Sequence, residues 1–178
     1  MIRPAAEADV AEVTAIYGHH VLNSTGTFEE TPPSEAEIAA RIAAARALGL
    51  PYLVAIDEDG RAAGFAYASA FRPRPAYRFT AEDSVYIRPD CMGRGLGKAL
   101  VAEVIADCAA LGVRQMIAVI GDGANAGSIG LHRSLGFAPA GVGRAFGFKF
   151  GRWLDVVWMQ KALGAGADAP PDGAGLPL

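Results

Sequence analysis

Hydrophobic positions follow helical spacing in the first fifty residues of the chain. Apolar side chains at positions 10, 13, 16, 17 and 21 fall on one face of a predicted helix over residues 7–22. A second helix is predicted from Ser34 to about Leu48, because Ser34 and Glu37 have the spacing of a capping box. A short strand over residues 2–4 precedes both helices.

The middle of the chain changes to extended patterns. Residues 52–56 and 62–71 predict two strands of a hairpin, because Asp59-Gly60 between them suits a tight turn. A proline-containing loop over 72–78 then leads to a strand over 83–88.

The second half alternates helices and strands. Apolar positions 96, 100, 104, 108 and 111 predict a helix that ends at Gly112. The remaining elements are predicted as a strand over 115–120, a helix over 125–135, and strands over 137–143 and 154–160. The order βααββ followed by βαβαββ indicates an α/β or α+β domain.

Composition limits the class of protein. The chain has 178 residues, 52% of them hydrophobic, which suits one domain over residues 1–162. Residues 163–178 are mainly Gly, Ala, Pro and Asp, and we expect them to form a disordered tail. A net charge of −3 argues against nucleic acid as a partner.

The two cysteines, Cys91 and Cys108, have neither metal-ligand spacing nor a disulfide framework. We therefore expect no metal and a reducing cytoplasmic location. No apolar run reaches the length of a membrane span, so no membrane association is expected. Cys91 has no neighbour in the sequence placed to activate it as a nucleophile.

The segment from Val85 to Lys98 is the most informative part of the chain. A β-type run ends in a turn with glycines at 93, 95 and 97, and this turn opens directly into a helix. Glycines let a ligand approach the backbone, while the free N–H groups and the dipole of the helix attract anions. The segment predicts a pyrophosphate-binding loop; a glycine-rich turn without a ligand is the alternative.

Two common phosphate loops do not fit these residues. A Walker A loop requires Ser or Thr after Gly97-Lys98, where Ala99 stands, and the glycine spacing differs from that of the dinucleotide fingerprint. The remaining pattern, R/Q-x-x-G-x-G/A, resembles the acetyl-CoA loop of the GNAT acetyltransferase superfamily. Met92 occupies the Arg/Gln position, which acts mainly through its backbone N–H.

A second motif strengthens this resemblance. The run from Asn125 to Phe137 is similar to the N-x-x-[AS]-x-x-[LF]-[YH]-x-x-x-G-F segment of GNAT enzymes. In that family the Asn reaches the pantetheine arm and the Tyr or His, here His132, lies near the thioester sulfur. The alternatives are a plain helix N-cap for Asn125 and a half-buried helix histidine for His132.

Further stretches at 71–77, 80–86, 116–121 and 147–155 resemble the phosphinothricin and methionine sulfoximine/sulfone N-acetyltransferases. The resemblance spans about residues 2–161. It implies the GNAT fold, a mixed and mostly antiparallel sheet of about seven strands flanked by about four helices. It also implies acetyl-CoA as co-substrate, bound by Val85, Tyr86, Ile87, Met92, Gly93, Arg94, Gly95, Leu96, Gly97, Lys98, Asn125 and Ser128.

The expected reaction is acetyl transfer to the α-amine of a small amino acid. An ammonium group must lose a proton before it attacks a thioester, and Glu82 is the candidate general base, acting directly or through water. His132 is a candidate to protonate the departing thiolate or to share the base role. Since no nucleophile with an adjacent base is apparent, direct transfer in a ternary complex is predicted.

An acceptor of this kind carries oxygens at both ends, so cations should bind it. Arg72, Arg74 and Lys149 are the candidates, with Phe28 and Tyr77 as pocket walls. We expect at least two of these cations to converge beside Glu82, in a homodimer. A GNAT enzyme for peptide or protein N-termini, and a non-catalytic acyl-CoA-binding module, are the alternative functions.

Overall fold

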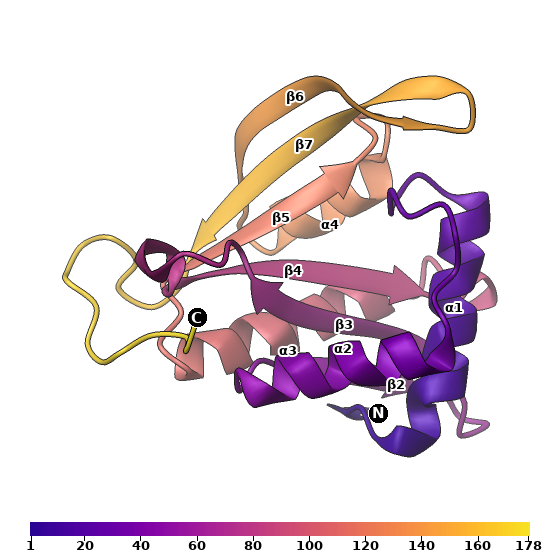
Figure 1. The fold of residues 1–178 in the computed structure, drawn as a ribbon, viewed down its shortest axis with the longest axis horizontal. Helices are drawn as coiled ribbons and strands as arrows, with labels where there is room; N and C mark the ends of the chain where they lie inside the picture. The colour runs from indigo at the N-terminus through magenta and orange to yellow at the C-terminus, as the bar shows by residue number, and fades with distance from the viewer.

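A computed structural model describes all residues from 1 to 178. It contains one seven-stranded sheet in the order β1-β2-β3-β4-β5-β7-β6 with four α-helices, which confirms the predicted GNAT-type architecture (Figure 1). The strands are β1 (Ile2–Pro4), β2 (Tyr52–Ile56), β3 (Ala62–Ala70), β4 (Thr80–Ile87), β5 (Gln115–Gly121), β6 (Ala138–Lys149) and β7 (Arg152–Ala162). The helices are α1 (Val10–Asn23), α2 (Glu35–Ala47), α3 (Leu96–Ala110) and α4 (Ala126–Ser134).

The sheet is mixed because one neighbouring pair, β4 and β5, is parallel. The two strands are paired only from Thr80, opposite Gln115, to Asp83, opposite Ala118. Beyond Asp83, β4 stays paired with β3 as far as Ile87 opposite Gly64. The carboxyl ends of β4 and β5 therefore diverge, and they open a gap in the middle of the sheet.

The helices cover opposite faces of this sheet, as β4 shows residue by residue. Tyr86 packs edge-on against Tyr17 of α1, with ring centroids 4.8 Å apart. The neighbouring Val85 and Ile87 lie on the other face, against Gly97 of α3. Because successive strand residues point to opposite faces, one short stretch of β4 contributes to both layers of the core.

Local sequence signals place the helix ends. The hydroxyl of Ser34 accepts a hydrogen bond from the Glu37 N–H, and Glu37 reaches back to the Ser34 N–H, which is the predicted capping box. Gly49 and Gly112, which follow α2 and α3, have φ angles of +73° and +84°. Glycine adopts this left-handed backbone without steric cost, so both helices end where the pattern predicts.

The hairpin of β6 and β7 is longer than predicted. The sequence indicated strands over 137–143 and 154–160, but β6 continues to Lys149 through a bulge in which the register shifts between Gly143 and Gly147. Asp155 stabilises this bulge, since its carboxylate accepts hydrogen bonds from Ala145 N and Arg144 Nη1. These contacts across the hairpin stabilise the bulge in a glycine-rich segment.

The segment after β7 contains neither helix nor strand. It nevertheless contacts the domain: Leu163 and Leu176 are buried, and Arg114 donates hydrogen bonds to the carbonyls of Gly166 and Ala169. Disorder of residues 163–178 in solution stays a prediction. None of the helices combines the length and the apolar character needed to cross a membrane.

Candidate active site

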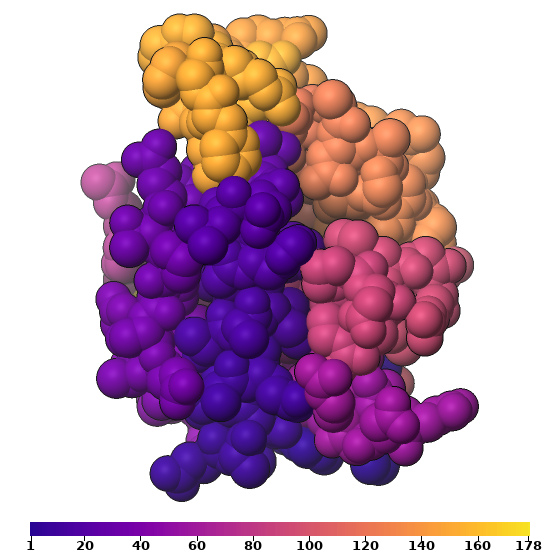
Figure 2. Space-filling model, turned by 90° about the vertical axis from the view of Figure 1, so that its right-hand side faces the viewer, coloured from indigo at the N-terminus to yellow at the C-terminus, as the bar shows by residue number.

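A cleft of ≈ 1020 Å³ opens where β4 and β5 diverge. Its walls come from the ends of β4 and β5, the end of α1, residues 24–26, the glycine loop before α3, helix α4, and the start of β7. In the space-filling view the molecule is hollowed between the indigo and purple N-terminal segments and the pink and orange segments opposite them (Figure 2). Segments distant in sequence thus meet around one cavity.

The predicted cofactor residues gather in this cleft, with one exception. The residues that line it are Val85, Tyr86, Ile87, Met92, Gly93, Gly95, Leu96, Gly97, Lys98, Asn125 and Ser128. Arg94 does not line it, because its Nη2 donates a 2.9 Å hydrogen bond to the carbonyl of Asp90. This contact stabilises the turn that precedes α3, and cofactor binding by Arg94 stays a prediction.

The three loop glycines have different physical roles. Gly93 and Gly95 have φ angles of +74° and +79°, in the region that favours glycine. Gly97 is needed for packing, since a Cβ there would lie 2.8 Å from Leu131 of α4. Gly95 is the N-cap of α3 and has no capping side chain, so the first N–H groups of this helix face the cleft without an intrahelical acceptor.

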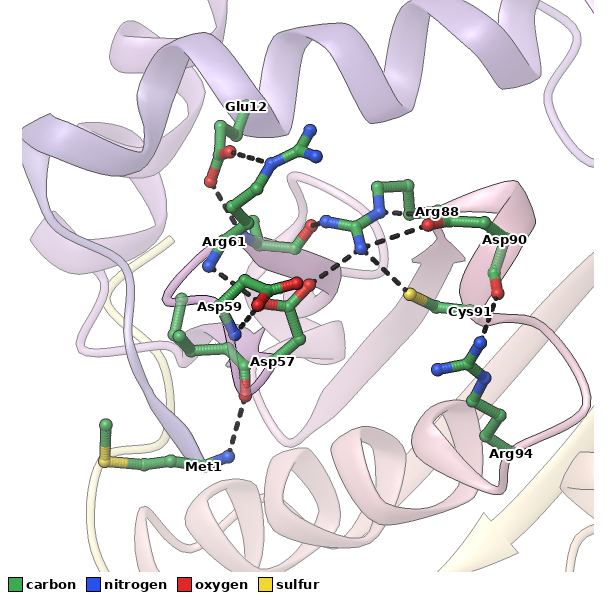
Figure 3. A network of polar contacts seen from close by, with 11 residues as sticks. Met1, Glu12, Asp57, Asp59, Arg61, Arg88, Asp90, Cys91 and Arg94 are labelled. Carbon is green, nitrogen blue, oxygen red and sulfur yellow. Dashed lines mark hydrogen bonds and ion pairs between the residues drawn. The ribbon is translucent and has the colours of Figure 1, made fainter.

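A network around Arg88 holds the glycine loop against the β2–β3 turn (Figure 3). The guanidinium donates to the carboxylates of Asp57 and Asp90, at 2.7 Å each, and to the carbonyl of Ala62 at 2.9 Å. The same group lies 3.2 Å from the sulfur of Cys91. The thiol is buried between this cation and the Asp90 carboxylate, and the expectation that Cys91 is not a nucleophile stays a prediction.

Asn125 caps α4 and lies on the cleft wall. Its side-chain oxygen accepts a 3.1 Å hydrogen bond from Ser128 N, so it caps α4, and the residue also lines the cleft. Asn125 therefore presents a polar side chain to the cleft from a fixed position at the start of a helix.

His132 is held at both ring nitrogens. Nε2 lies 2.9 Å from Asp83 Oδ2 and Nδ1 lies 2.8 Å from the Ser128 carbonyl, which can only accept a hydrogen bond. Burial alone lowers the pKa of His132, but the hydrogen bond and charge of Asp83 and the Ser128 carbonyl outweigh it, so the pKa is raised. The imidazole is thus a hydrogen-bond donor on both sides, so neither ring nitrogen offers a free lone pair, and the role of His132 as acid or base stays a prediction.

Asp83→Asn should make the stability of the protein less dependent on pH, because it removes the carboxylate that raises the pKa of His132. A histidine whose folded pKa exceeds the unfolded value of about 6.5 stabilises the fold fully below that pH and loses the effect as pH rises through the folded pKa. The melting temperature of the native protein should therefore fall more between about pH 6 and about pH 9 than that of the variant. Asp107→Asn, at an exposed position, is the matched control. Parallel profiles for native protein and Asp83→Asn would contradict the assignment.

Glu82 lies on β4 immediately before Asp83. Burial raises the pKa of this carboxyl, the charge of Asp83 raises it further, and the charge of Arg72 opposes the shift. Glu82 does not itself line the cleft, whereas Ser84, two residues along the same face of the strand, does. The carboxylate is therefore adjacent to the cleft wall, a position that fits action through a water molecule.

The proline-containing loop after β3 lies outside the cleft. Arg72 is near enough to Glu82 to affect its pKa, and it stacks 4.4 Å from the centroid of Phe71. Arg74 is exposed at the start of a short turn, and Tyr77 packs edge-on against Phe71. None of the predicted acceptor-binding residues Phe28, Arg72, Arg74, Tyr77 and Lys149 lines the cleft.

Lys149 is buried, unlike the two predicted arginines, and it donates to backbone carbonyls. The residue is only 2% exposed, and its Nζ donates to the carbonyls of Ser24 and Thr27 at 2.9 and 2.8 Å. It therefore does not converge with Arg72 on an acceptor, and convergence of Arg72 and Arg74 beside Glu82 stays a prediction. Phe28 packs against Gly121 and Gly147, where no side chain would fit beside its ring. Lys149 and Phe28 hold the segment after α1 against β5 and β6, and residues 24–26 of this segment form one wall of the cleft.

Sequence reasoning missed several polar residues of the cleft, among them Thr25, Asp83, Asp122 and Arg152. Each resembles an ordinary solvated side chain in the sequence, so no local pattern marked it. No group of three or more His, Cys, Asp or Glu side chains is arranged to hold a metal ion.

The comparisons with known proteins agree with this geometry. Residues 2–158 match the family model described as acetyltransferase (GNAT) domain. The chain is 50% identical over 171 residues to phosphinothricin N-acetyltransferase of Alcaligenes faecalis, covering 96% of this chain and 86% of the relative. It is 43% identical over 169 residues to the L-methionine sulfoximine/L-methionine sulfone acetyltransferase of Pseudomonas aeruginosa, covering 95% and 98%.

A solved structure extends the likeness to three dimensions. It is a GNAT superfamily phosphinothricin acetyltransferase from Sinorhizobium meliloti in complex with AcCoA. The two chains superpose with a TM-score of 0.95 at 52% identity, covering 99% of this chain and 95% of the other.

Proposed function

This chain belongs to the GNAT acetyltransferase family, and we propose that it transfers the acetyl group of acetyl-CoA to the α-amine of a small amino acid such as phosphinothricin, methionine sulfoximine or methionine sulfone. The observation that carries the proposal is the cleft between the diverging strands β4 and β5, with the glycine loop among its walls. The names of the relatives supply the acceptor class.

Acetyl-CoA is assigned to this cleft by the chemistry of its walls. Backbone N–H groups of the glycine loop and the dipole of α3 attract the pyrophosphate. The part of β4 that has lost β5 as a neighbour, from Ser84 to Ile87, offers unpaired backbone groups to the pantetheine amides. An N–H of this stretch is also placed to stabilise the oxyanion of the tetrahedral intermediate. The side chain of Asn125 adds a polar contact to the pantetheine arm.

The proposed reaction removes two protons from the acceptor nitrogen and supplies one to the CoA thiolate. Glu82 accepts a proton from the acceptor ammonium through water, and its raised pKa makes it a better base near neutrality than an ordinary carboxylate. The amine nitrogen then attacks the thioester carbonyl carbon, the C–N bond forms, and the C–S bond breaks. His132 gives its proton to the departing thiolate, and the imidazole takes up the second proton of the acceptor nitrogen, through water, as the amide forms. The proton held by Glu82 is released to solvent. Because Glu82 beside the cleft wall and His132 in the cleft fill both roles, the proposed reaction includes no acyl-enzyme.

An acceptor panel tests this proposal. The purified chain is supplied with acetyl-CoA and with phosphinothricin, methionine sulfoximine, methionine sulfone, methionine or a short peptide, and the released thiol is measured. We expect the first three to give the highest kcat/KM. Preference for the peptide would instead support the alternative acceptor, a peptide or protein N-terminus. Tolerance of a host cell to phosphinothricin would follow from the same reaction.

An exposed aromatic surface supports a homodimer. Phe146, Phe148 and Trp153 on the β6–β7 hairpin are 64%, 57% and 65% exposed, and Phe148 and Trp153 pack edge-on. Contiguous apolar surface of this kind is uncommon on monomers, so we propose that a second copy covers it. Sedimentation should give a species of twice the chain mass; a monomer at micromolar concentration would contradict this.

The two buried free cysteines agree with the proposed cytoplasmic location.

A further inference from the structure

An aspartate–arginine pair forms part of the cleft wall away from the glycine loop. Arg152 is the first residue of β7, and Asp122 directly follows β5. Arg152 Nη2 lies 2.7 Å from Asp122 Oδ2, and both residues line the cleft. The arginine side chain is 55% exposed and the aspartate 12%, so the guanidinium is open to ligands while its partner is covered.

Asp122 is held in one position. Its Oδ1 accepts a 3.0 Å hydrogen bond from Ala124 N, and its Oδ2 also accepts one of 3.1 Å from the hydroxyl of Thr25. The Ala124 N–H first, and the Arg152 guanidinium next, keep the pKa of this carboxyl below its ordinary value. A φ of +67° is uncommon for an aspartate, and these contacts maintain it. Asp122 is thus a fixed anion that orients Arg152.

The guanidinium retains donors for a ligand. Arginine has five N–H donors, and the structure gives Arg152 one hydrogen bond, from Nη2 to Asp122. The remaining N–H groups of a planar fork match the paired oxygens of a carboxylate, phosphinate or sulfone. Arg152 can therefore bind an acceptor oxyanion without leaving Asp122.

Other cations near the cleft are less suited to this task. Lys149 donates to two carbonyls, and Arg72 and Arg74 do not line the cleft. Lys98 belongs to the first turn of α3, where the phosphates are expected. Arg152 is the one arginine among the cleft-lining residues, and it comes from a different wall.

We propose that Arg152 binds an oxyanion of the acceptor amino acid, so that the amine is directed toward the divergence of β4 and β5. This inference rests on the proposed function, because it concerns the acceptor of that reaction. The oxyanion has two possible sources, the α-carboxylate and the oxygens of the side chain, and the choice of acceptors distinguishes them.

The test compares Arg152→Gln with Arg144→Gln. Arg144 is a matched control: it lies on the same hairpin, pairs with Asp155 at 2.6 Å, is 80% exposed, and does not line the cleft. Each protein is assayed with methionine sulfone, with methionine sulfone amide, which lacks the carboxylate, and with norleucine, which lacks the side-chain oxygens. The KM for acetyl-CoA and the melting temperature are measured alongside.

We expect Arg152→Gln to lower kcat/KM for methionine sulfone by roughly ten- to a hundredfold, the scale of one lost charge-assisted hydrogen bond, with an unchanged KM for acetyl-CoA. If the loss persists for norleucine and vanishes for the amide, Arg152 binds the α-carboxylate. If it persists for the amide and vanishes for norleucine, Arg152 binds the side-chain oxygens. Arg152→Lys should recover part of the loss, and Arg144→Gln should behave as the native protein.

Equal losses for all three acceptors would overturn the inference, because a merely structural role of Arg152 does not distinguish acceptors. An unchanged kcat/KM for methionine sulfone would overturn it as well. In both cases the native protein still acetylates amino acids, and the proposed function stands. A native protein that acetylates none of them would refute the proposed function, and this inference with it.

Discussion

Glu82→Gln is expected to lower kcat by about 100-fold or more near neutral pH, which is the scale of general-base catalysis. Glutamine keeps the size and polarity of the side chain and removes its ability to accept a proton. In the native protein kcat/KM should fall as pH decreases through the raised pKa of Glu82, because the base becomes protonated. The loss in Glu82→Gln should be smaller at high pH, where the acceptor amine is already deprotonated.

Steady-state kinetics over a range of pH measure this effect. Glu103→Gln, an exposed position on α3, makes the same chemical change away from the cleft and should leave the kinetics unaltered. If Glu82→Gln changes KM alone and leaves kcat intact, Glu82 is a binding residue and the base must be sought elsewhere. A loss that is independent of pH would also exclude proton transfer as its role.

Gly95→Asp should raise the KM for acetyl-CoA by more than about tenfold, since it places a negative charge where the N–H groups of α3 are expected to attract pyrophosphate. A Cβ at Gly95 would meet no atom within 4 Å, so the variant has room for its side chain. The φ of +79° makes any side chain here strained by about 1–2 kcal/mol. Gly95→Ala carries this strain without the charge.

The difference in KM between Gly95→Asp and Gly95→Ala measures how much the added negative charge alone weakens acetyl-CoA binding. Met92→Ala should change little, because the loop is expected to act through backbone N–H at that position and the Met92 side chain is 56% exposed. Calorimetric titration with acetyl-CoA, or its KM, measures the effect. If Gly95→Asp and Met92→Ala both change the KM for acetyl-CoA equally and only slightly, the glycine loop does not bind the pyrophosphate.

The sequence by itself determined the fold and the cofactor end of the cleft. A strand, two glycines that adopt positive φ, and the free N-terminus of α3 follow one another within a few residues, so their chemistry is encoded locally. The same holds for Asn125, whose side chain caps the helix that it begins. Local backbone preference and helix capping act over about four residues, which is why a pattern reveals them.

Only the tertiary structure decided the roles of the charged side chains. Lys149 bonds to Thr27, 122 residues away; His132 bonds to Asp83 across 49 residues, and Arg152 to Asp122 across 30. A charged group in a loop has the same sequence signature whether it is solvated, buried or turned toward a ligand. Its partner and its exposure are set by the packing of distant segments, because desolvation must be offset by groups that the chain brings together only on folding.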